Sequence, residues 1–334
     1  MIVDKEKDEK YMRRCIQIAR GGLLTAKPNP SVGAVIVAED GRIIGEGFTS
    51  AYGGPHAEVN AFASVSPDDE RLLPGATVYV SLEPCSHWGK TPPCCDLIIR
   101  KGVRRVVCGC VDPFAKVQGR GIRKIREAGI EVDVGVLEEE CRESNKRFFT
   151  FNTKHRPFII LKWAQSVDGY LDDNFRPTMF STPFTAMLSH KLRAENDAIL
   201  VGRTTVDRDS PQLNVREWSG NDPVRIVLTK DKDFAQRFLT AHQNNWHCMA
   251  SVGEVLDFLY ANGRQSLIVE GGAATLQSFI DAGLWDVIRV ETAPRLVFRG
   301  TPAPKMPPVD NPAKLRTDSR QYDGNTIFTY EKLL

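Results

Sequence analysis

The chain has 334 residues, of which 42% are hydrophobic and 26% are charged. This length is comfortable for two domains, and the composition excludes disordered and fibrous proteins. Lys and Arg number 44 against 42 for Asp and Glu, so the net charge of +2 gives no reason to expect a nucleic-acid partner.

The first ten residues are mostly charged, so they lack the apolar core of a signal peptide. No later apolar run is long enough to span a bilayer, and we expect a cytoplasmic protein without a membrane partner. In a reducing compartment the eight cysteines are not expected to form a disulfide framework.

The N-terminal half alternates predicted helices and strands. Apolar residues at helical spacing predict a helix over 9–20, and a turn at 39–42 joins two strands into a hairpin. The later elements are strands at 77–82, 104–110 and 131–136 and helices at 56–64, 92–101, 119–128 and 138–149. Such alternation predicts an α/β layer sandwich, and we assign residues 1–150 to it.

Two short motifs carry the chemistry of this half. Pro55-His56-Ala57-Glu58 is followed by Glu83-Pro84-Cys85 and, after eight further residues, by Cys94. One imidazole and two thiols are typical of a catalytic zinc site, which leaves the fourth position to water. Glu58 lies close enough to move protons there. We expect the three ligands at the starts of two helices, where backbone N–H groups favour thiolates.

A closed structural zinc site is the alternative interpretation of this motif. Such sites have four protein ligands, and Cys95 or His87 could supply the fourth. The pairing of His56 with Glu58 favours the catalytic interpretation, because zinc deaminases of nucleobases combine a His-x-Glu motif with two cysteines.

The C-terminal half predicts a mixed sheet. Expected strands cover 158–163, 198–202, 224–229, 266–270, 287–292 and 326–331, and expected helices cover 183–194 and 252–262. A glycine turn at Gly271-Gly272 leads into another helix, which makes a candidate anion site. The turn is not Gly-x-Gly-x-x-Gly, so a Rossmann-type dinucleotide fold is not supported. We assign residues 155–334 to this domain.

The long loop between Cys85 and Cys94 resembles the deaminase half of the bifunctional riboflavin-biosynthesis deaminase/reductase family. The resemblance implies a cytidine-deaminase-like fold, zinc held by His56, Cys85 and Cys94, and Glu58 as the proton-transferring acid. It also implies substrate contacts, and the residues expected there are Asn29, His87 and Lys90. On residue type alone, Asn29 could shape a turn, and His87 and Lys90 could be solvated loop residues.

The second half resembles the reductase half of the same family through three segments in order, namely Leu161-Lys162, Ser166-Val167-Asp168-Gly169 and Ala293-Pro294-Arg295-Leu296. The resemblance implies a fold similar to dihydrofolate reductase and an NADPH site, expected at Ala164, Thr205, Asp209, Gly272, Ala273, Ala274, Thr275, Leu276 and Gln277. Residues expected to face the substrate are Lys162, Arg193, Leu213, Arg216 and Glu270.

Charge and pattern bear on these reductase residues. Arg193 and Arg216 suit a substrate phosphate, because a guanidinium matches phosphate oxygens bidentately. Lys162 is the candidate catalytic residue that supports the developing alkoxide, although strand alternation alone would make it solvent-facing.

The resemblance implies two consecutive reactions on a phosphorylated pyrimidine. The first would hydrolyse the 2-amino group of a diamino-ribosylamino-pyrimidinone 5′-phosphate, and the second would reduce the ribosyl group to ribityl with NADPH. It also implies a homodimer or larger assembly made through the reductase half. The chain departs from the family pattern at Thr49, where a histidine is usual, and at Phe114, where an asparagine is usual.

Two rival functions stay open on the sequence alone. One is a monofunctional nucleotide or tRNA deaminase whose C-terminal domain binds a partner, although no basic excess favours RNA. The other is a zinc-stabilised scaffold without turnover, for which Glu58 would be dispensable.

Overall fold

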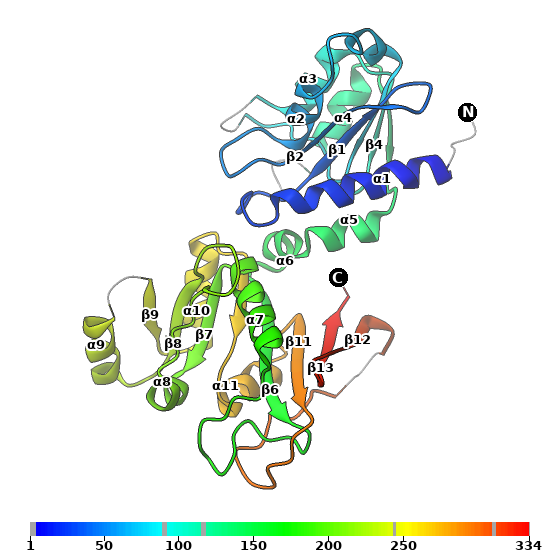
Figure 1. The fold of residues 1–334 in the computed structure, drawn as a ribbon. Coiled ribbons are helices and arrows are strands. Elements are labelled where there is room, and N and C mark those ends of the chain that lie inside the picture. Colours follow the sequence, from blue (N-terminus) through cyan, green and yellow to red (C-terminus); the bar gives the residue numbers. More distant parts are fainter. Residues whose placement is uncertain (1–4, 89–91, 115–117, 243–244, 309–311, 334) are drawn as a thin grey trace. The chain divides into compact units, whose positions relative to one another are not determined.

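The computed structural model describes residues 5–88, 92–114, 118–242, 245–308 and 312–333. The chain divides into two compact units, Met1–Thr153 and Lys154–Leu334. Each unit is built on one mixed sheet with helices packed on it (Figure 1), which confirms the predicted α/β class. Within the described ranges, no helix combines the length and the apolarity that a membrane crossing requires.

The N-terminal unit contains a five-stranded sheet in the order β2-β1-β3-β4-β5. Strands β1 and β2 form the predicted hairpin, β3 pairs antiparallel with β1, and β4 and β5 continue in parallel. The strands are β1 (Gly33–Val37), β2 (Ile43–Phe48), β3 (Thr77–Val80), β4 (Arg105–Cys108) and β5 (Glu131–Val134).

Helices cover both faces of this sheet (Figure 1), and close backbone approaches set their positions. A Cβ atom on Gly33 would lie 2.0 Å from the Cys15 carbonyl oxygen of α1, and one on Gly47 would lie 2.3 Å from the Ala61 nitrogen of α2. Gly47 pairs with Ala34, the neighbour of Gly33, so the two glycines face opposite sides of the sheet. The helices are α1 (Lys5–Ala19), α2 (Ala57–Ala63), α3 (Cys94–Lys101), α4 (Arg120–Glu127), α5 (Glu138–Ser144) and α6 (Lys146–Lys154), with 3₁₀ turns η1 (Arg20–Gly22) and η2 (Glu70–Gly75).

The single helix predicted over 138–149 is two helices, because Asn145 interrupts it. Asn145 adopts a non-helical backbone conformation at the end of α5. Its side chain accepts from the Ser31 N–H at 2.8 Å and donates to the Ser31 carbonyl at 3.0 Å. A buried amide that bonds a distant backbone segment competes with the helix.

The C-terminal unit contains an eight-stranded sheet in the order β12-β13-β11-β6-β10-β7-β8-β9. Strand β13 runs antiparallel to both of its neighbours, and the other pairs are parallel. The strands are β6 (Phe158–Ser166), β7 (Ala198–Gly202), β8 (Val224–Leu228), β9 (Trp246–Met249), β10 (Ser266–Val269), β11 (Val287–Ala293), β12 (Leu315–Tyr322) and β13 (Asn325–Lys332).

Two edge strands and two helices of this unit were not predicted from the sequence. Strand β12 is polar and exposed along almost its whole length, so it shows no period-2 apolar pattern. Strand β9 is short and half-buried. The helices are α7 (Pro183–Glu195), α8 (Arg203–Asp209), α9 (Lys232–Ala241), α10 (Val252–Ala261) and α11 (Ala273–Asp281), with a 3₁₀ turn η3 (Pro312–Lys314), and α8 and α9 are the unpredicted ones.

Candidate functional site

The His56, Cys85 and Cys94 side chains meet in the N-terminal unit. Their candidate ligand atoms all lie within 4.8 Å of one another. His56 is the N-cap residue of α2 and Cys94 is the first residue of α3, as expected. Cys85 lies instead in the loop after β3, so only two of the three ligands stand at helix starts.

The distances within this triad fit a zinc ion. The His56 Nδ1 atom lies 3.5 Å from the Cys85 Sγ atom and 3.4 Å from the Cys94 Sγ atom. Ligand bonds of about 2.0 and 2.3 Å at a tetrahedral angle place nitrogen and sulfur about 3.5 Å apart. The Cys94 thiol and its backbone N–H, together with His56, lower the pKa of Cys85, so this cysteine is present as thiolate.

Glu58 lies in the first turn of α2 beside the triad and is only 4% exposed. Burial raises the pKa of Glu58 to about 7, with the Cys85 charge acting in the same direction. A carboxyl group whose pKa is near neutrality can both accept and donate a proton at physiological pH, which a proton shuttle requires.

Neither candidate for a fourth protein ligand joins the triad. The Cys95 thiol points toward the Asp96 carboxylate at 3.6 Å, and burial raises the pKa of Cys95 to about 12. Among the residues that the structure describes, the metal-binding group contains His56, Cys85 and Cys94 and excludes His87. This arrangement favours the open catalytic site over the closed structural one.

Glu83, which the sequence analysis did not single out, ties the Cys85 loop to helix α4. Its carboxylate accepts backbone N–H groups of Gly119 at 2.8 Å, Gly121 at 3.0 Å, Asp112 at 3.3 Å and Ile122 at 3.4 Å. Glu83 is 4% exposed, so the charge is buried and stabilised by these donors. Its position directly before Pro84-Cys85 was the available signal.

The residues expected to contact the deaminase substrate have distinct environments. Asn29 lies half-buried in the loop before β1, and Lys90 lies outside the described residues. The His87 ring meets the Phe114 ring edge-on at 6.1 Å, and its Nδ1 atom is buried without a hydrogen-bond partner. Thr49 is 4% exposed, and its hydroxyl accepts a hydrogen bond from the Val32 N–H at 2.9 Å. This hydroxyl therefore satisfies a backbone donor.

In the C-terminal unit, Arg193 and Glu270 form a mostly buried ion pair. The Arg193 Nη2 atom lies 2.7 Å from the Glu270 Oε2 atom, while Arg193 Nε and Glu270 Oε1 are buried without partners. Burial raises the pKa of Glu270, but the charges of Lys162 and Arg193 outweigh it, so the net shift is downward. The half-buried Lys162 therefore lies close enough to Glu270 for its charge to act on this carboxylate.

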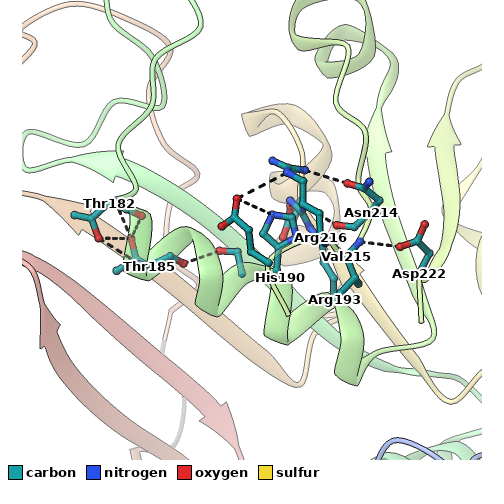
Figure 2. A network of polar contacts seen from close by, with 11 residues as sticks. Thr182, Thr185, His190, Arg193, Asn214, Val215, Arg216 and Asp222 are labelled. Atoms are coloured by element: carbon teal, nitrogen blue, oxygen red, sulfur yellow. Dashed lines mark hydrogen bonds and ion pairs between the residues drawn. The ribbon is translucent and has the colours of Figure 1, made fainter. Parts of the chain in front are cut away.

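Leu213 and Arg216 belong to the loop that follows α8. Leu213 is buried and has a φ angle of 52°. The Arg193 Nη1 atom donates to the Asn214 carbonyl at 3.3 Å (Figure 2). The same arginine therefore contacts both this loop and Glu270. The structure thus brings Lys162, Arg193, Glu270 and the loop into one polar cluster.

The expected cofactor residues gather where β7 and β10 end. The Thr205 hydroxyl of α8 accepts the Gly272 N–H at 3.0 Å, and a Cβ atom on Gly202 would lie 2.4 Å from the Thr275 hydroxyl. Gly272 is the N-cap of α11 and offers no side chain to cap it. The N–H groups of its first turn suit a pyrophosphate. The other expected positions are Ala164 on β6, exposed Asp209 at the end of α8, and Ala273, Ala274, Leu276 and Gln277 on α11.

Two family models match the chain. Residues 5–110 match the zinc-binding region of cytidine and deoxycytidylate deaminases, and residues 157–328 match the RibD C-terminal domain. The riboflavin biosynthesis protein RibD of Aquifex aeolicus is 40% identical over 89% of this chain and 89% of its own length. The RibD protein of Escherichia coli is 34% identical over 87% of this chain and 88% of its own.

Solved structures give the same result over the whole length. A Thermotoga maritima diaminohydroxyphosphoribosylaminopyrimidine deaminase/5-amino-6-(5-phosphoribosylamino)uracil reductase is 35% identical, covers 98% of this chain and 99% of its own, and superposes with a TM-score of 0.87. A RibD structure from Acinetobacter baumannii is 29% identical, covers 99% and 100%, and has a TM-score of 0.85.

Proposed function

The chain belongs to the RibD family of bifunctional deaminase/reductases of riboflavin biosynthesis, and on this premise we propose the reaction and the residues of each unit. The N-terminal unit hydrolyses the 2-amino group of a diamino-ribosylamino-pyrimidinone 5′-phosphate and releases ammonia. The C-terminal unit then reduces the ribosyl group of the resulting uracil to ribityl with NADPH. The name of the Thermotoga maritima relative supports these substrates.

The observation that carries the first reaction is the His56, Cys85 and Cys94 triad with buried Glu58 beside it. Zinc bound by three protein ligands supplies a Lewis acid that activates water. Glu58 would take a proton from the attacking water and deliver it to the departing amino group. Burial raises the pKa of Glu58 to about 7, near neutral pH, which supports both proton transfers.

Replacement of Glu58 by glutamine tests this assignment. Because the amide cannot shuttle protons, we expect deamination to fall by about two to four orders of magnitude while zinc content is unchanged. NADPH oxidation with the deaminated product is expected to stay at the wild-type rate. Glu139→Gln, at an exposed position of α5, is the matched control. A variant that still releases ammonia at the wild-type rate would exclude Glu58 as the proton shuttle.

For the second reaction, Lys162 and the Arg193–Glu270 pair would contact the substrate. The unpartnered Arg193 Nε and Glu270 Oε1 atoms support this assignment, because buried polar atoms are normally satisfied and a bound sugar phosphate could satisfy them. Lys162 would stabilise the developing alkoxide. NADPH would place its pyrophosphate at the start of α11 and its nicotinamide near Ala164.

Glu270→Gln probes the reductase assignment. The amide keeps the size of the side chain but removes the charge that pairs with Arg193 and Lys162, so we expect NADPH oxidation to fall by about tenfold or more. Ammonia release by the N-terminal unit should not change. An unaltered rate of NADPH oxidation would remove Glu270 from the substrate site.

We further propose that residues 1–150 and 155–334 act as separate domains and that the chain forms a homodimer or larger assembly through the reductase half. Family resemblance alone supports the assembly, and a monomer in light scattering at micromolar concentration would exclude it. The cytoplasmic location stays a prediction.

A further inference from the structure

Helix α7 holds the loop that carries Arg216 through two side chains (Figure 2). His190 and Arg193 both reach from α7 to this loop. The Arg193 Nη1 atom donates to the Asn214 carbonyl at 3.3 Å. The backbone N–H of Arg216 donates to the His190 Nδ1 atom, also at 3.3 Å. Asn214 and Arg216 are therefore each tied to the same helix.

The hydrogen bond identifies the protonation state of His190. Because an N–H group donates to Nδ1, that nitrogen is unprotonated and the ring proton resides on Nε2. His190 is 3% exposed. Burial lowers the pKa of His190, as do the charges of Arg193 and Arg216. The Glu217 carboxylate, whose Oε1 atom lies 3.9 Å from Nε2, and a hydrogen bond with the Asn214 backbone act in the opposite direction, and the net shift is downward. The neutral ring therefore persists at pH 7 as an acceptor.

The Arg216 side chain has no comparable anchor. It is 54% exposed, and its polar partners among the residues that the structure describes are the Asn214 Oδ1 atom at 3.0 Å and the Glu217 carboxylate at 3.8 Å, both in the same loop. Contacts within one exposed loop move with that loop and do not fix it to the domain. The position of the guanidinium is thus set by where the Arg216 backbone is held.

We propose that His190 is a positioning residue of the reductase: by accepting the Arg216 N–H, it holds the Arg216 guanidinium where the phosphate of the substrate binds. This inference rests on the proposed role of Arg216 in substrate binding. His190 itself is buried and acts through the loop.

A second tether limits what the loss of His190 can do. The Val215 N–H donates to the Asp222 Oδ1 atom at 2.7 Å, Asp222 in turn pairs with Arg225 of β8, and buried Leu213 anchors the start of the loop. The loop should therefore stay attached when the His190 bond is lost, with a wider range of positions open to Arg216. Such a change weakens substrate binding more than it slows the hydride transfer.

The test compares His190→Leu with His190→Asn in the full-length, zinc-loaded chain. Leucine removes the acceptor, whereas the asparagine oxygen stands close to the position of Nδ1. For the deaminated product with saturating NADPH, we expect His190→Leu to raise KM about five- to tenfold with kcat within about twofold. Asparagine should restore KM to within about twofold of wild type. The thermal transition of the C-terminal unit, measured by differential scanning calorimetry, reports whether each variant is folded.

The pH dependence of KM separates this role from packing. Protonated His190 has no acceptor at Nδ1, so lowering the pH should raise the wild-type KM beyond the effect of titrating the substrate phosphate. The charged groups that face the ring are Arg193 from α7 and Arg216 and Glu217 from the loop. His190→Asn keeps these groups and lacks the titrating ring, so its KM should rise less in acid.

Arg216→Ala distinguishes failure of the inference from failure of the proposed substrate contact. If Arg216→Ala raises KM while both His190 variants leave it unchanged, the positioning role is overturned and the substrate contact stands. If both His190 variants raise KM equally, and their KM rises at low pH as much as that of wild type, His190 contributes packing alone and the inference is overturned. If Arg216→Ala leaves KM unchanged, the substrate contact fails and the inference fails with it.

Discussion

Glu83→Gln should loosen the junction between the Cys85 loop and helix α4. Each carboxylate oxygen accepts two N–H groups: Oε1 those of Gly121 and Ile122, and Oε2 those of Gly119 and Asp112. Glutamine keeps one acceptor oxygen and turns an NH₂ group toward the other two donors. Two bonds to a charged group are therefore lost, and two buried N–H groups are left without partners.

The magnitude follows from these bonds. At about 1.5 kcal/mol or more for each bond to a charge, and with incomplete additivity, the unit should lose about 2 to 4 kcal/mol of unfolding free energy. For a unit of this size, 1 kcal/mol corresponds to about 2 to 4 °C, so we expect its Tm to fall by about 4 to 16 °C. The zinc content of the purified protein should fall as well, because the Cys85 loop is no longer fixed.

Differential scanning calorimetry of the full chain measures this change. The comparison is made after chelation, because bound zinc would itself raise the Tm. Glu127→Gln, at an exposed position of α4, is the matched control. The transition of the C-terminal unit provides an internal reference and should not move. A Tm for Glu83→Gln within 1 or 2 °C (about the effect of a surface substitution) of the control would refute the reasoning.

Three further predictions concern the C-terminal unit and the domain organisation. Arg156 donates to buried Asp286 at 2.5 and 2.9 Å and, although burial acts in the opposite direction, holds the pKa of Asp286 below its usual value. The carboxylate therefore stabilises the fold above about pH 4 and less so as pH falls through the lowered pKa. As the pH is lowered, the Tm of wild type should drop more steeply than that of Asp286→Asn. An equal drop in both proteins would exclude stabilisation by the ionised Asp286 carboxylate. Gly202→Ala should weaken NADPH binding about tenfold in a fluorescence titration, because its Cβ atom displaces the Thr275 hydroxyl in the first turn of α11. Unchanged affinity would exclude this close approach from the cofactor site. Fragments 1–150 and 155–334 should each fold and keep one activity, and two folded but inactive fragments would contradict separability.

The zinc site shows what can be predicted from local sequence. His56 and Glu58 are two residues apart, and their helix start was indicated by the pattern that follows them. Ligand chemistry depends on residue type, so one imidazole and two thiols already indicated zinc. The loop between the cysteines carried the family resemblance.

Long-range contacts were not predictable in the same way. Three of the four donors that satisfy Glu83 lie at the start of α4, the partner of Asn145 is Ser31, and Arg193 on α7 meets Glu270 after β10. None of these pairs has a spacing that indicates contact. Strand β12 was not predicted because its residues do not alternate between apolar and polar. Only its pairing with β13 makes it a strand.

The sequence by itself determined which groups can bind a metal, which segments bury an apolar face, and therefore the two α/β units, because residue type and periodicity act over a few neighbours. Only the tertiary structure decided that Cys85 comes from a loop and that a glutamate anchors this loop. It also decided that a neutral histidine on α7 meets the Arg216 backbone. These contacts join residues that the chain separates widely, and their energy exists only after the sheet has brought their elements together.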